Sequence, residues 1–222
     1  MQGCIALGNP LSKALHVLVP QADSETTPST MSPFDEAQHN GGGKTLPLDV
    51  YDSILTYLNM LLPSSPIWHF KDLPHPMDTF VLPPMAVPLH HLQHKGCTCS
   101  YSTFTMHPGN SSISYRTRSG GAHMGFIVSM WAQVAMGKSH IFVIVSPHRL
   151  LSAGDKKMSP YQSRPGFLSS VVYSQQSDPH QAIVMEKQQI IAHVAYYSHP
   201  PGTFGIGAET LVLINSLHCN QD

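Results

Sequence analysis

The side chains with the clearest potential for chemistry are histidines and cysteines that cluster near the middle of the sequence: His90, His94, Cys97 and Cys99. On a helix, His90 and His94 would share one face; on a strand, Cys97 and Cys99 would do so. Imidazole and thiolate are typical zinc ligands, but this spacing matches no common zinc module, and structural sites usually take ligand pairs from two separated segments. We therefore expect a histidine-rich turn that leads into a strand with two buried cysteines. We predict no bound metal; the alternative is a site formed by these four residues.

Two short sequences resemble the end of a phosphate-binding loop: Gly-Lys-Thr at 43–45 and Gly-Lys-Ser at 137–139. The motif requires a further glycine five residues upstream, where this chain has Gln38 and Ala132. Both sequences are therefore better explained as turns. The chain also lacks the Gly-x-Ser-x-Gly signature of serine hydrolases. We predict a protein that is not an enzyme and that has no cofactor.

Charged residues make up only 11% of the chain, and they are unevenly distributed. Residues 1–90 hold three basic and eight acidic residues, a net charge of −5, whereas residues 91–222 hold nine basic and five acidic residues, a net charge of +4. This surplus is too small to indicate nucleic-acid binding by itself. A nucleic-acid interface would require seven of the nine basic residues of the second half to converge on one face. These residues are Arg116, Arg118, Lys138, Arg149, Lys156, Lys157 and Arg164.

The sequence predicts a tail followed by a single β-rich domain over residues 46–222. Residues 1–45 are rich in Pro, Ser, Thr and Gly, which favours a disordered tail or linker because little apolar surface is available for burial. Apolar residues recur at helical spacing over 46–62, with Asp49 as the expected N-cap. The prolines and histidines that follow predict an extended arm over 63–96, without long helices or central strands.

After this arm, short β-branched runs alternate with turn signals, which predicts a β core over 97–218. The segment Ile-Phe-Val-Ile-Val at 141–145 indicates a buried central strand. Closely spaced strands favour a partly open β-barrel or a sandwich, here with one packed N-terminal helix and a proline-rich arm. The expected fold class is therefore mainly β. The expected strands span residues 97–106, 111–116, 124–135, 139–146, 169–174, 181–186, 190–197 and 209–215.

One of these strands contains a tryptophan whose surroundings bear on function. Strict alternation places Phe126, Val128 and Met130 on one uniformly apolar face, which is the predicted core, and Trp131 on the opposite face with Ser129. Trp131 is then either covered by the proline-rich arm or exposed to a partner. We expect coverage, because large aromatic side chains are usually mostly buried. The candidate interaction residues are Trp131, Arg116, Arg118, Arg149, Lys156 and Lys157.

Several segments resemble a known group of proteins. They include His-Pro-Gly-Asn-Ser-Ser at 107–112, Gly-Phe-Ile-Val-Ser-Met-Trp at 125–131 and Pro-Pro-Gly-Thr-Phe-Gly-Ile at 200–206. Over about residues 46–218 the chain resembles a large group of proteins of mushroom-forming fungi, encoded in transposon-rich genome regions. That group implies no activity and no catalytic residue.

A second resemblance concerns the order of elements. The tryptophan-containing segment, followed by a strand that ends in Ser-Pro-His-Arg-Leu-Leu, is similar to the core of bromo-adjacent-homology (BAH) domains. This likeness implies a β-barrel that binds chromatin or other proteins. The low charge of the chain and its lack of an evident aromatic cage depart from that pattern.

Three functions from different classes are compatible with these features. The leading hypothesis is a non-catalytic protein-interaction module from a mobile-element-derived gene, with an unidentified protein partner. The first alternative is a nucleic-acid- or chromatin-associated domain, and the second is a metal-dependent enzyme built on the His/Cys cluster. No secretory signal and no apolar stretch of membrane-spanning length is visible, so we expect an intracellular protein that does not contact membranes. A nuclear location is compatible with this expectation.

Overall fold

A computed structural model describes residues 42–93, 100–163, 169–176 and 182–214. All of them belong to one contact unit, which covers residues 32–222. Several features that the sequence singled out lie outside the described residues: most of the predicted tail, and His94, Cys97, Cys99 and Arg164.

Short helices and turns interrupt a succession of strands. The helices are α3 (Leu48–Leu61), α4 (Pro108–Ser111) and α5 (Ala153–Met158), and the 3₁₀ turns are η2 (Pro160–Ser163), η4 (Lys187–Gln189) and η5 (Thr203–Gly205). The strands before residue 120 are β1 (Lys44–Thr45), β2 (Met85–Leu89), β3 (His91–Gln93), β4 (Ser100–Ser102) and β5 (Ser112–Arg116). The later strands are β6 (Ala122–Ala135), β7 (Lys138–Leu150), β8 (Ser169–Gln176), β9 (Ile183–Glu186), β10 (Ile190–His193), β11 (Ala195–His199) and β12 (Thr210–Ile214).

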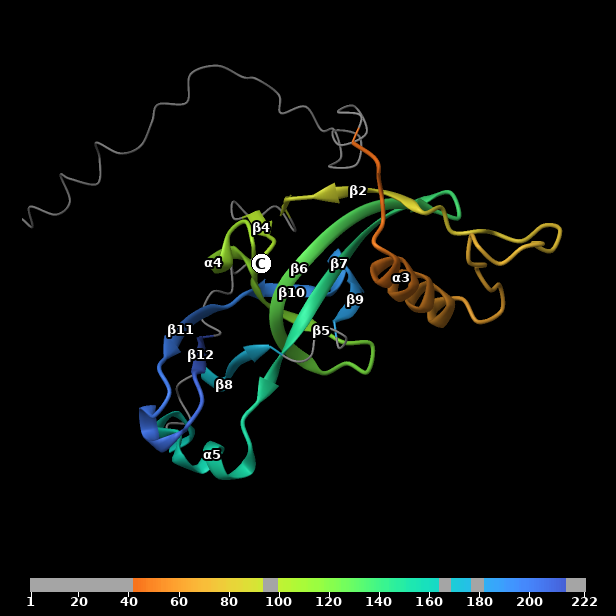
Figure 1. Cartoon of the computed structure of the whole chain (residues 1–222). Helices are drawn as coiled ribbons and strands as arrows, with labels where there is room; N and C mark the ends of the chain where they lie inside the picture. The colour runs from red at the N-terminus through yellow and green to blue at the C-terminus, as the bar shows by residue number, and fades with distance from the viewer. Residues whose placement is uncertain (1–41, 94–99, 164–168, 177–181, 215–222) are drawn as a thin grey trace, which may run out of the picture. The chain divides into compact units, whose positions relative to one another are not determined.

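The fold is mainly β, as the sequence predicts, and it is organised around the long hairpin of β6 and β7 (Figure 1). The two strands join through Met136 and Gly137, which have φ angles of 52° and 72°. Positive φ at both residues is typical of the tight turn that matches the twist of paired strands. The Gly-Lys-Ser sequence at 137–139 therefore belongs to a hairpin turn, as expected.

The strands beside this hairpin curl the sheet back toward itself. On one side β6 pairs with β5, and β5 pairs with β10; on the other side β7 pairs with β9. The two ends of this row, β9 and β10, are consecutive in the chain and joined by η4. Among the described residues no ladder joins β9 to β10, so the curled sheet keeps an open seam. The prediction of a partly open barrel is confirmed.

Apolar side chains fill the inside of the curl. Cross-strand neighbours of the row β9–β7–β6–β5–β10 supply most of this core, and β3 and β4 contribute Leu92 and Tyr101. A second cluster lies where β8, β12 and β11 extend the sheet beyond the end of β7; it holds Val172, Leu211 and Leu213. Side chains from strands that are distant in the sequence therefore pack together in these two apolar clusters.

Helix α3 and the arm that follows it form a third apolar cluster on the outer face of the hairpin. The predicted helix is confirmed, but the expected N-cap is wrong: Pro47 occupies the cap position, and Asp49 lies in the first turn. Tyr51 and Ile54 are buried against Leu82 of the arm and Phe142 of β7. The Tyr51 hydroxyl donates to the Leu82 carbonyl at 2.9 Å, which fixes the arm against the helix.

The proline-rich arm is more regular than its sequence predicts, because its last part forms β2. This strand pairs with β6 from Val87 to Leu89, although Pro88 lies between those two residues. On its other side, β2 pairs with β1 only at Met85 and Ala86. At Pro88 the strand is thus a sheet edge, where a missing N–H interrupts no ladder bond. The proline argument excludes a central strand but not this edge.

A β-bulge at Val128 makes the predicted alternation in β6 wrong. The register passes from Ile127, opposite Val145, to Ser129, opposite Ile144, which leaves Val128 unpaired and 45% exposed. After the extra residue, each side chain points to the face of the sheet opposite to the one that strict alternation predicts. Ile127 and Met130 consequently both point into the core of the curl.

The same bulge turns Trp131 toward α3. Trp131 is half-buried against the cluster that contains Leu82 and Phe80 of the arm, and its indole Nε1 donates to Ser129 Oγ at 3.1 Å. The expected covering of this side chain by the arm is therefore found, shared with the helix.

Truncation of Trp131 should destabilise the protein. We expect Trp131→Ala to lower the free energy of unfolding by about 3 kcal/mol, because it removes the large ring that joins β6 to the helix cluster. Val128→Ala, three residues away on the exposed bulge, serves as the control and should change it by less than about 0.5 kcal/mol. Urea unfolding monitored by circular dichroism measures both. Equal stabilities of Trp131→Ala and wild type would contradict this packing.

A buried histidine should make the fold sensitive to acid. His148 on β7 is buried edge-on against Phe126, at 4.6 Å between ring centroids, and its Nε2 has no hydrogen-bond partner among the described residues. Burial lowers the pKa of His148 to about 4. The unfolded chain therefore takes up the proton more readily than the folded one, so stability is full above about pH 6.5 and declines as the pH falls toward 4.

Acidification from pH 7.5 to 4.5 should therefore lower the free energy of unfolding by about 3 kcal/mol at this site. His148→Gln should remove most of that decline, because the amide does not titrate. His91→Gln, at an exposed position on β3, should retain it. Urea titrations across this pH range give the comparison. The same decline in His148→Gln as in wild type would assign the acid sensitivity to other groups.

Candidate functional site

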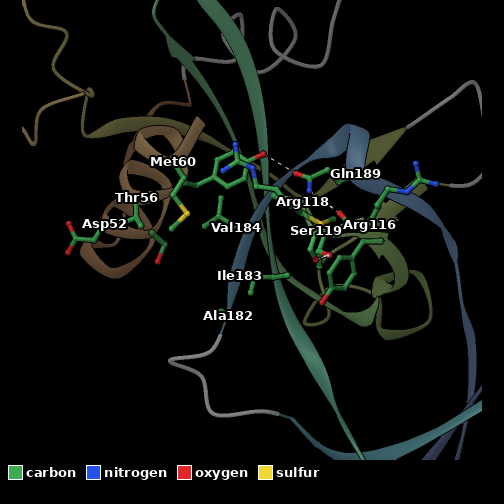
Figure 2. A pocket seen from close by; sticks show the side chains of 15 residues that line it. Asp52, Thr56, Met60, Arg116, Arg118, Ser119, Ala182, Ile183, Val184 and Gln189 are labelled. Carbon is green, nitrogen blue, oxygen red and sulfur yellow. Dashed lines mark hydrogen bonds between the residues drawn. The ribbon is translucent and has the colours of Figure 1, made fainter. Parts of the chain in front are cut away.

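A cavity with a volume of about 560 Å³ lies beside the open seam of the curled sheet. Figure 2 shows α3 on one side of it, the β5–β6 turn on the other, and β9 between them. The helix contributes Asp52, Ser53, Thr56, Tyr57 and Met60. Strand β9 and its flanks contribute Ala182, Ile183, Val184, Met185 and Gln189, and β5 with its turn contributes Tyr115, Arg116, Thr117, Arg118 and Ser119. We call this cavity the seam cleft.

One glutamine side chain joins the three walls of the seam cleft. Gln189 Oε1 accepts hydrogen bonds from the Tyr57 hydroxyl at 2.9 Å and from the Glu186 N–H at 3.0 Å. Its amide nitrogen donates to the Arg116 carbonyl at 2.9 Å. Gln189 therefore connects α3, β9 and β5 across the seam, where no backbone ladder among the described residues does so.

Local sequence explains why Gln189 takes this position. Glu186 and Gln189 form a reciprocal capping box around η4, in which each side chain accepts a hydrogen bond from the backbone N–H of the other. The Glu186 carboxylate also lies 2.9 Å from Nδ1 of His140 on β7. These contacts hold the turn between β9 and β10 in one conformation and keep the seam at a fixed width.

Within the described strands, β9 has one unpaired edge, and this edge borders the cleft. The strand pairs with β7 on one side, and no described strand pairs with the other side. The Glu186 N–H points away from β7, because it donates to Gln189. Backbone direction alternates along an antiparallel strand, so the N–H and C=O of Val184 also point toward the free edge. The cleft therefore presents one backbone donor and one acceptor among apolar side chains.

The two phenols of the cleft act as neutral hydrogen-bonding groups at physiological pH. Burial is the main cause that raises the pKa of Tyr57; the Glu186 carboxylate adds to the rise, and Arg118 opposes it. Burial alone raises the pKa of Tyr115 to about 12. Both side chains thus keep their protons, and the cleft is suited to binding through apolar contacts and hydrogen bonds.

Two cations stand at the rim of the cleft. The Arg118 guanidinium lies 5.5 Å from the centre of the Tyr57 ring, and Arg116, two residues earlier in the chain, is also exposed. Within the described part of the chain, neither arginine forms a salt bridge. The acidic residue on the opposite wall, Asp52, has its own partner in His69 at 3.2 Å. The rim near the β5–β6 turn is therefore electropositive.

The structure distributes the predicted interaction residues over separate places. Arg116 and Arg118 lie together at the seam cleft, whereas Lys156 and Lys157 lie in the last turn of α5. Lys138 begins β7 and Arg149 is near its end, eleven residues along the strand, which corresponds to about 36 Å. Trp131 contacts the helix cluster. The basic residues that are described therefore do not converge on one face.

The His/Cys cluster falls largely outside the structure. His90 is exposed between β2 and β3, and the other three candidate ligands are not described. The described residues contain no group of three or more His, Cys, Asp or Glu side chains that could hold a metal ion.

The seam cleft contains residues that the sequence analysis did not single out. Gln189, Ile183 and Val184 carry no recognisable motif, and Tyr57 was expected only as part of a packing helix. One local signal was present: a Glu followed three residues later by a Gln is the spacing of a capping box. That spacing indicates the turn, but not what lies beside it.

Comparisons with known proteins add no neighbour: no family model matches the chain, and no curated protein or solved structure does. In the described part of the chain, no helix has the length and apolar character needed to cross a membrane.

Loss of the Gln189 side chain should loosen the seam. Gln189→Ala leaves the Tyr57 hydroxyl, the Glu186 N–H and the Arg116 carbonyl without their partner, and water can replace it only in part. We expect a loss of about 1–2 kcal/mol in the free energy of unfolding and faster amide exchange in β9. Gln93→Ala, at an exposed position on β3, is the control. Unchanged exchange in β9 would show that Gln189 does not hold the seam.

Proposed function

We propose that the protein is a non-catalytic interaction module and that the seam cleft binds an extended, acidic segment of a partner protein. The observation that carries this proposal is the free edge of β9 inside a cleft with apolar walls and an electropositive rim. Extended peptides commonly bind by adding a strand to such an edge, where the backbone gives affinity and side-chain pockets give specificity.

The backbone of β9 supports the first part of this proposal. Val184 directs its N–H and C=O toward the cleft, and Glu186 directs its N–H to a side chain rather than to a strand. Natural proteins usually protect a free edge with charges, prolines or a covering segment. The edge of β9 carries Ile183 and Val184, and beside it lies a cavity rather than a covering strand. A bound strand would satisfy these groups.

The size and lining of the cleft support a short peptide segment. Its volume of about 560 Å³ lies within the range of sites that take small ligands or a few side chains. Met60 on α3 is 63% exposed and faces this space with Thr56 and Ile183. An apolar side chain of the bound segment would remove this methionine from water.

The rim supports an acidic partner. Arg116 and Arg118 have no carboxylate partner among the described residues, and both line the cleft from β5 and the turn that follows it. Arginine binds carboxylates through two parallel hydrogen bonds, which adds orientation to attraction. A carboxylate in the partner segment, one or two residues from its apolar anchor, would meet this pair.

The proposal also covers the origin of the protein and its location in the cell. A module of this kind agrees with the resemblance to bromo-adjacent-homology domains and with an origin in a mobile-element-derived gene. We propose an intracellular setting, in which a partner's extended acidic tail is available to the cleft.

Selection of peptides against the full chain tests this function. A phage-displayed library of randomised octapeptides should enrich sequences that alternate apolar and acidic residues. A synthetic peptide of that sequence should bind saturably in fluorescence anisotropy. Methylation of alternate backbone nitrogens in this peptide should weaken binding at least tenfold, because it removes the strand hydrogen bonds. Enrichment of basic peptides, no enrichment, or equal binding of the methylated peptide would overturn the proposal.

A pair of matched variants locates the site. The double variant Arg116→Gln/Arg118→Gln should weaken the acidic peptide about tenfold, since charged hydrogen bonds are lost. The double variant Lys156→Gln/Lys157→Gln removes the same charge from α5 and should leave peptide affinity unchanged. Equal effects of the two variants would mean that the peptide responds only to net charge.

A further inference from the structure

A second surface, distant along β7 from the hairpin turn, combines exposed aromatic rings with lysines. It is formed by β11, η5, η2 and α5, which Figure 1 shows grouped at the outer end of the β8–β12–β11 sheet. Its aromatic members are Tyr161, Tyr197, His199 and Phe204. We call it the aromatic–lysine surface.

The rings of this surface support one another and leave one of them exposed. His199 packs edge-on against both Tyr197 and Phe204, at 5.0 Å and 5.1 Å between centroids. Tyr161 meets Phe204 at 6.0 Å and approaches His199, with 3.4 Å between the phenol oxygen and Nε2. Tyr197 is 64% exposed and lies on β11, the edge strand of this sheet. The cluster thus holds an open ring on a rigid support.

The backbone keeps Phe204 in this cluster. Phe204 has a φ of 55°, in the left-handed region that non-glycine residues rarely adopt, and it lies between Gly202 at φ 90° and Gly205 at φ 78°. Only a well-determined environment retains such a conformation in a bulky residue. The strained turn keeps a phenyl ring 38% exposed beside the tyrosines, and strain of this kind is typical of ligand-binding segments.

Helix α5 places positive charge next to these rings. Met158 at its end reaches Gly205: a Cβ at that glycine would lie 3.5 Å from the Met158 sulfur. Lys156 and Lys157 occupy the same last turn and are exposed. Arg149, at the end of β7, lies 4.8 Å from the ring of Tyr173, whose hydroxyl donates to Asp155 of α5. Lys156 and Lys157 therefore lie on the helical turn that contacts η5, and Arg149 packs against Tyr173 beside the same helix.

The carboxylates of this region are already engaged. Asp155 accepts the hydrogen bond from Tyr173, and Glu209 accepts one from Ser198. Neither forms a salt bridge with a lysine or arginine among the described residues. Lys156, Lys157 and Arg149 outnumber these two carboxylates, which leaves a net charge of +1 that favours anions. A cationic ligand is disfavoured, both by the two lysines and because the rings contact one another and leave no space between them.

We infer that the aromatic–lysine surface binds single-stranded nucleic acid. Exposed rings that stack on bases, next to cations that contact phosphates, are the two components of sequence-tolerant recognition of single strands. Tyr197 is the stacking platform, supported by His199, and Lys156 and Lys157 are the phosphate contacts. This site is separate from the seam cleft and does not depend on the function proposed for it.

The number of cations on this surface sets the expected salt dependence of binding. Each cation that neutralises one phosphate of a single strand contributes about 0.7 to the slope of log affinity against log salt concentration. Three cations predict a slope of about −2 and a site of only a few nucleotides. Duplex DNA should bind more weakly than a single strand, because its bases are not accessible to Tyr197.

Fluorescence anisotropy of a labelled oligothymidine of about twelve nucleotides, titrated with the full chain at about 50 mM salt, tests the inference. The matched probes are an abasic strand of the same length and a duplex of the same sequence. We expect saturable binding of oligothymidine and at least fivefold weaker binding of both controls. No saturable binding, or equal affinity for the abasic strand, would overturn the inference.

Variants of exposed residues separate stacking from charge. Tyr197→Ala should weaken oligothymidine binding about tenfold, whereas Tyr197→Phe should keep it within twofold, because the phenyl ring still stacks. Lys156→Gln/Lys157→Gln should reduce the salt slope by about 1 to 1.5. Arg116→Gln/Arg118→Gln, which removes equal charge at the seam cleft, should leave oligothymidine affinity unchanged. An equal loss in the two double variants, or a loss in Tyr197→Phe as large as in Tyr197→Ala, would overturn the assignment.

Discussion

The interaction on which the rest of the structure depends is the pairing of β6 with β7, which runs from Gly125 and Pro147 to Ala135 and Lys138 and is interrupted at one residue. The bulge at Val128 changes the face of the sheet to which the side chains after it point. As a result, β6 supplies side chains to all three apolar clusters. Close approach of the strands adds a second constraint at Gly125, where a Cβ would lie 2.5 Å from the Ser146 carbonyl oxygen. Only glycine allows β6 and β7 to meet there, and this contact permits the sharp curl of the sheet.

The curl in turn produces the seam cleft. Because β9 pairs with β7 and β10 pairs with β5, the short turn η4 that joins β9 to β10 must cross the gap between the two ends of the row. Four-residue strands on either side are too short to close that gap by backbone pairing. Side chains take over the connection, chiefly Gln189, and they leave the edge of β9 unpaired. The unpaired edge is thus a consequence of incomplete closure of the described sheet.

The sequence predicts those features that depend on neighbours in the chain. Helical spacing predicts α3, and the Ile-Phe-Val-Ile-Val run predicts the buried centre of β7. Prediction from the sequence fails where contacts between residues distant in the chain determine the structure. Nothing in β6 marks Val128 as the unpaired residue, since any of several β-branched positions could bulge. Pro88 forbids a central strand but not an edge, and which of the two applies depends on where β1 ends. Tyr57 and Gln189 are separated by more than a hundred residues, and only the fold reveals their contact.

Because the chain carries few charges, a few charged side chains determine which ligands each surface attracts. With 11% charged residues, the chain has little of the mixed surface charge that usually neutralises single side chains. Asp52, Asp155, Glu186 and Glu209 each already hold a histidine or a hydroxyl group. The arginines of the seam and the lysines of α5 form no salt bridge among the described residues, so they set the charge of the surfaces on which they lie. Their fields are felt over about a Debye length of 8 Å in physiological salt. The neighbours of each cation then distinguish its ligand: a free strand edge at the seam, and an exposed aromatic ring beside α5.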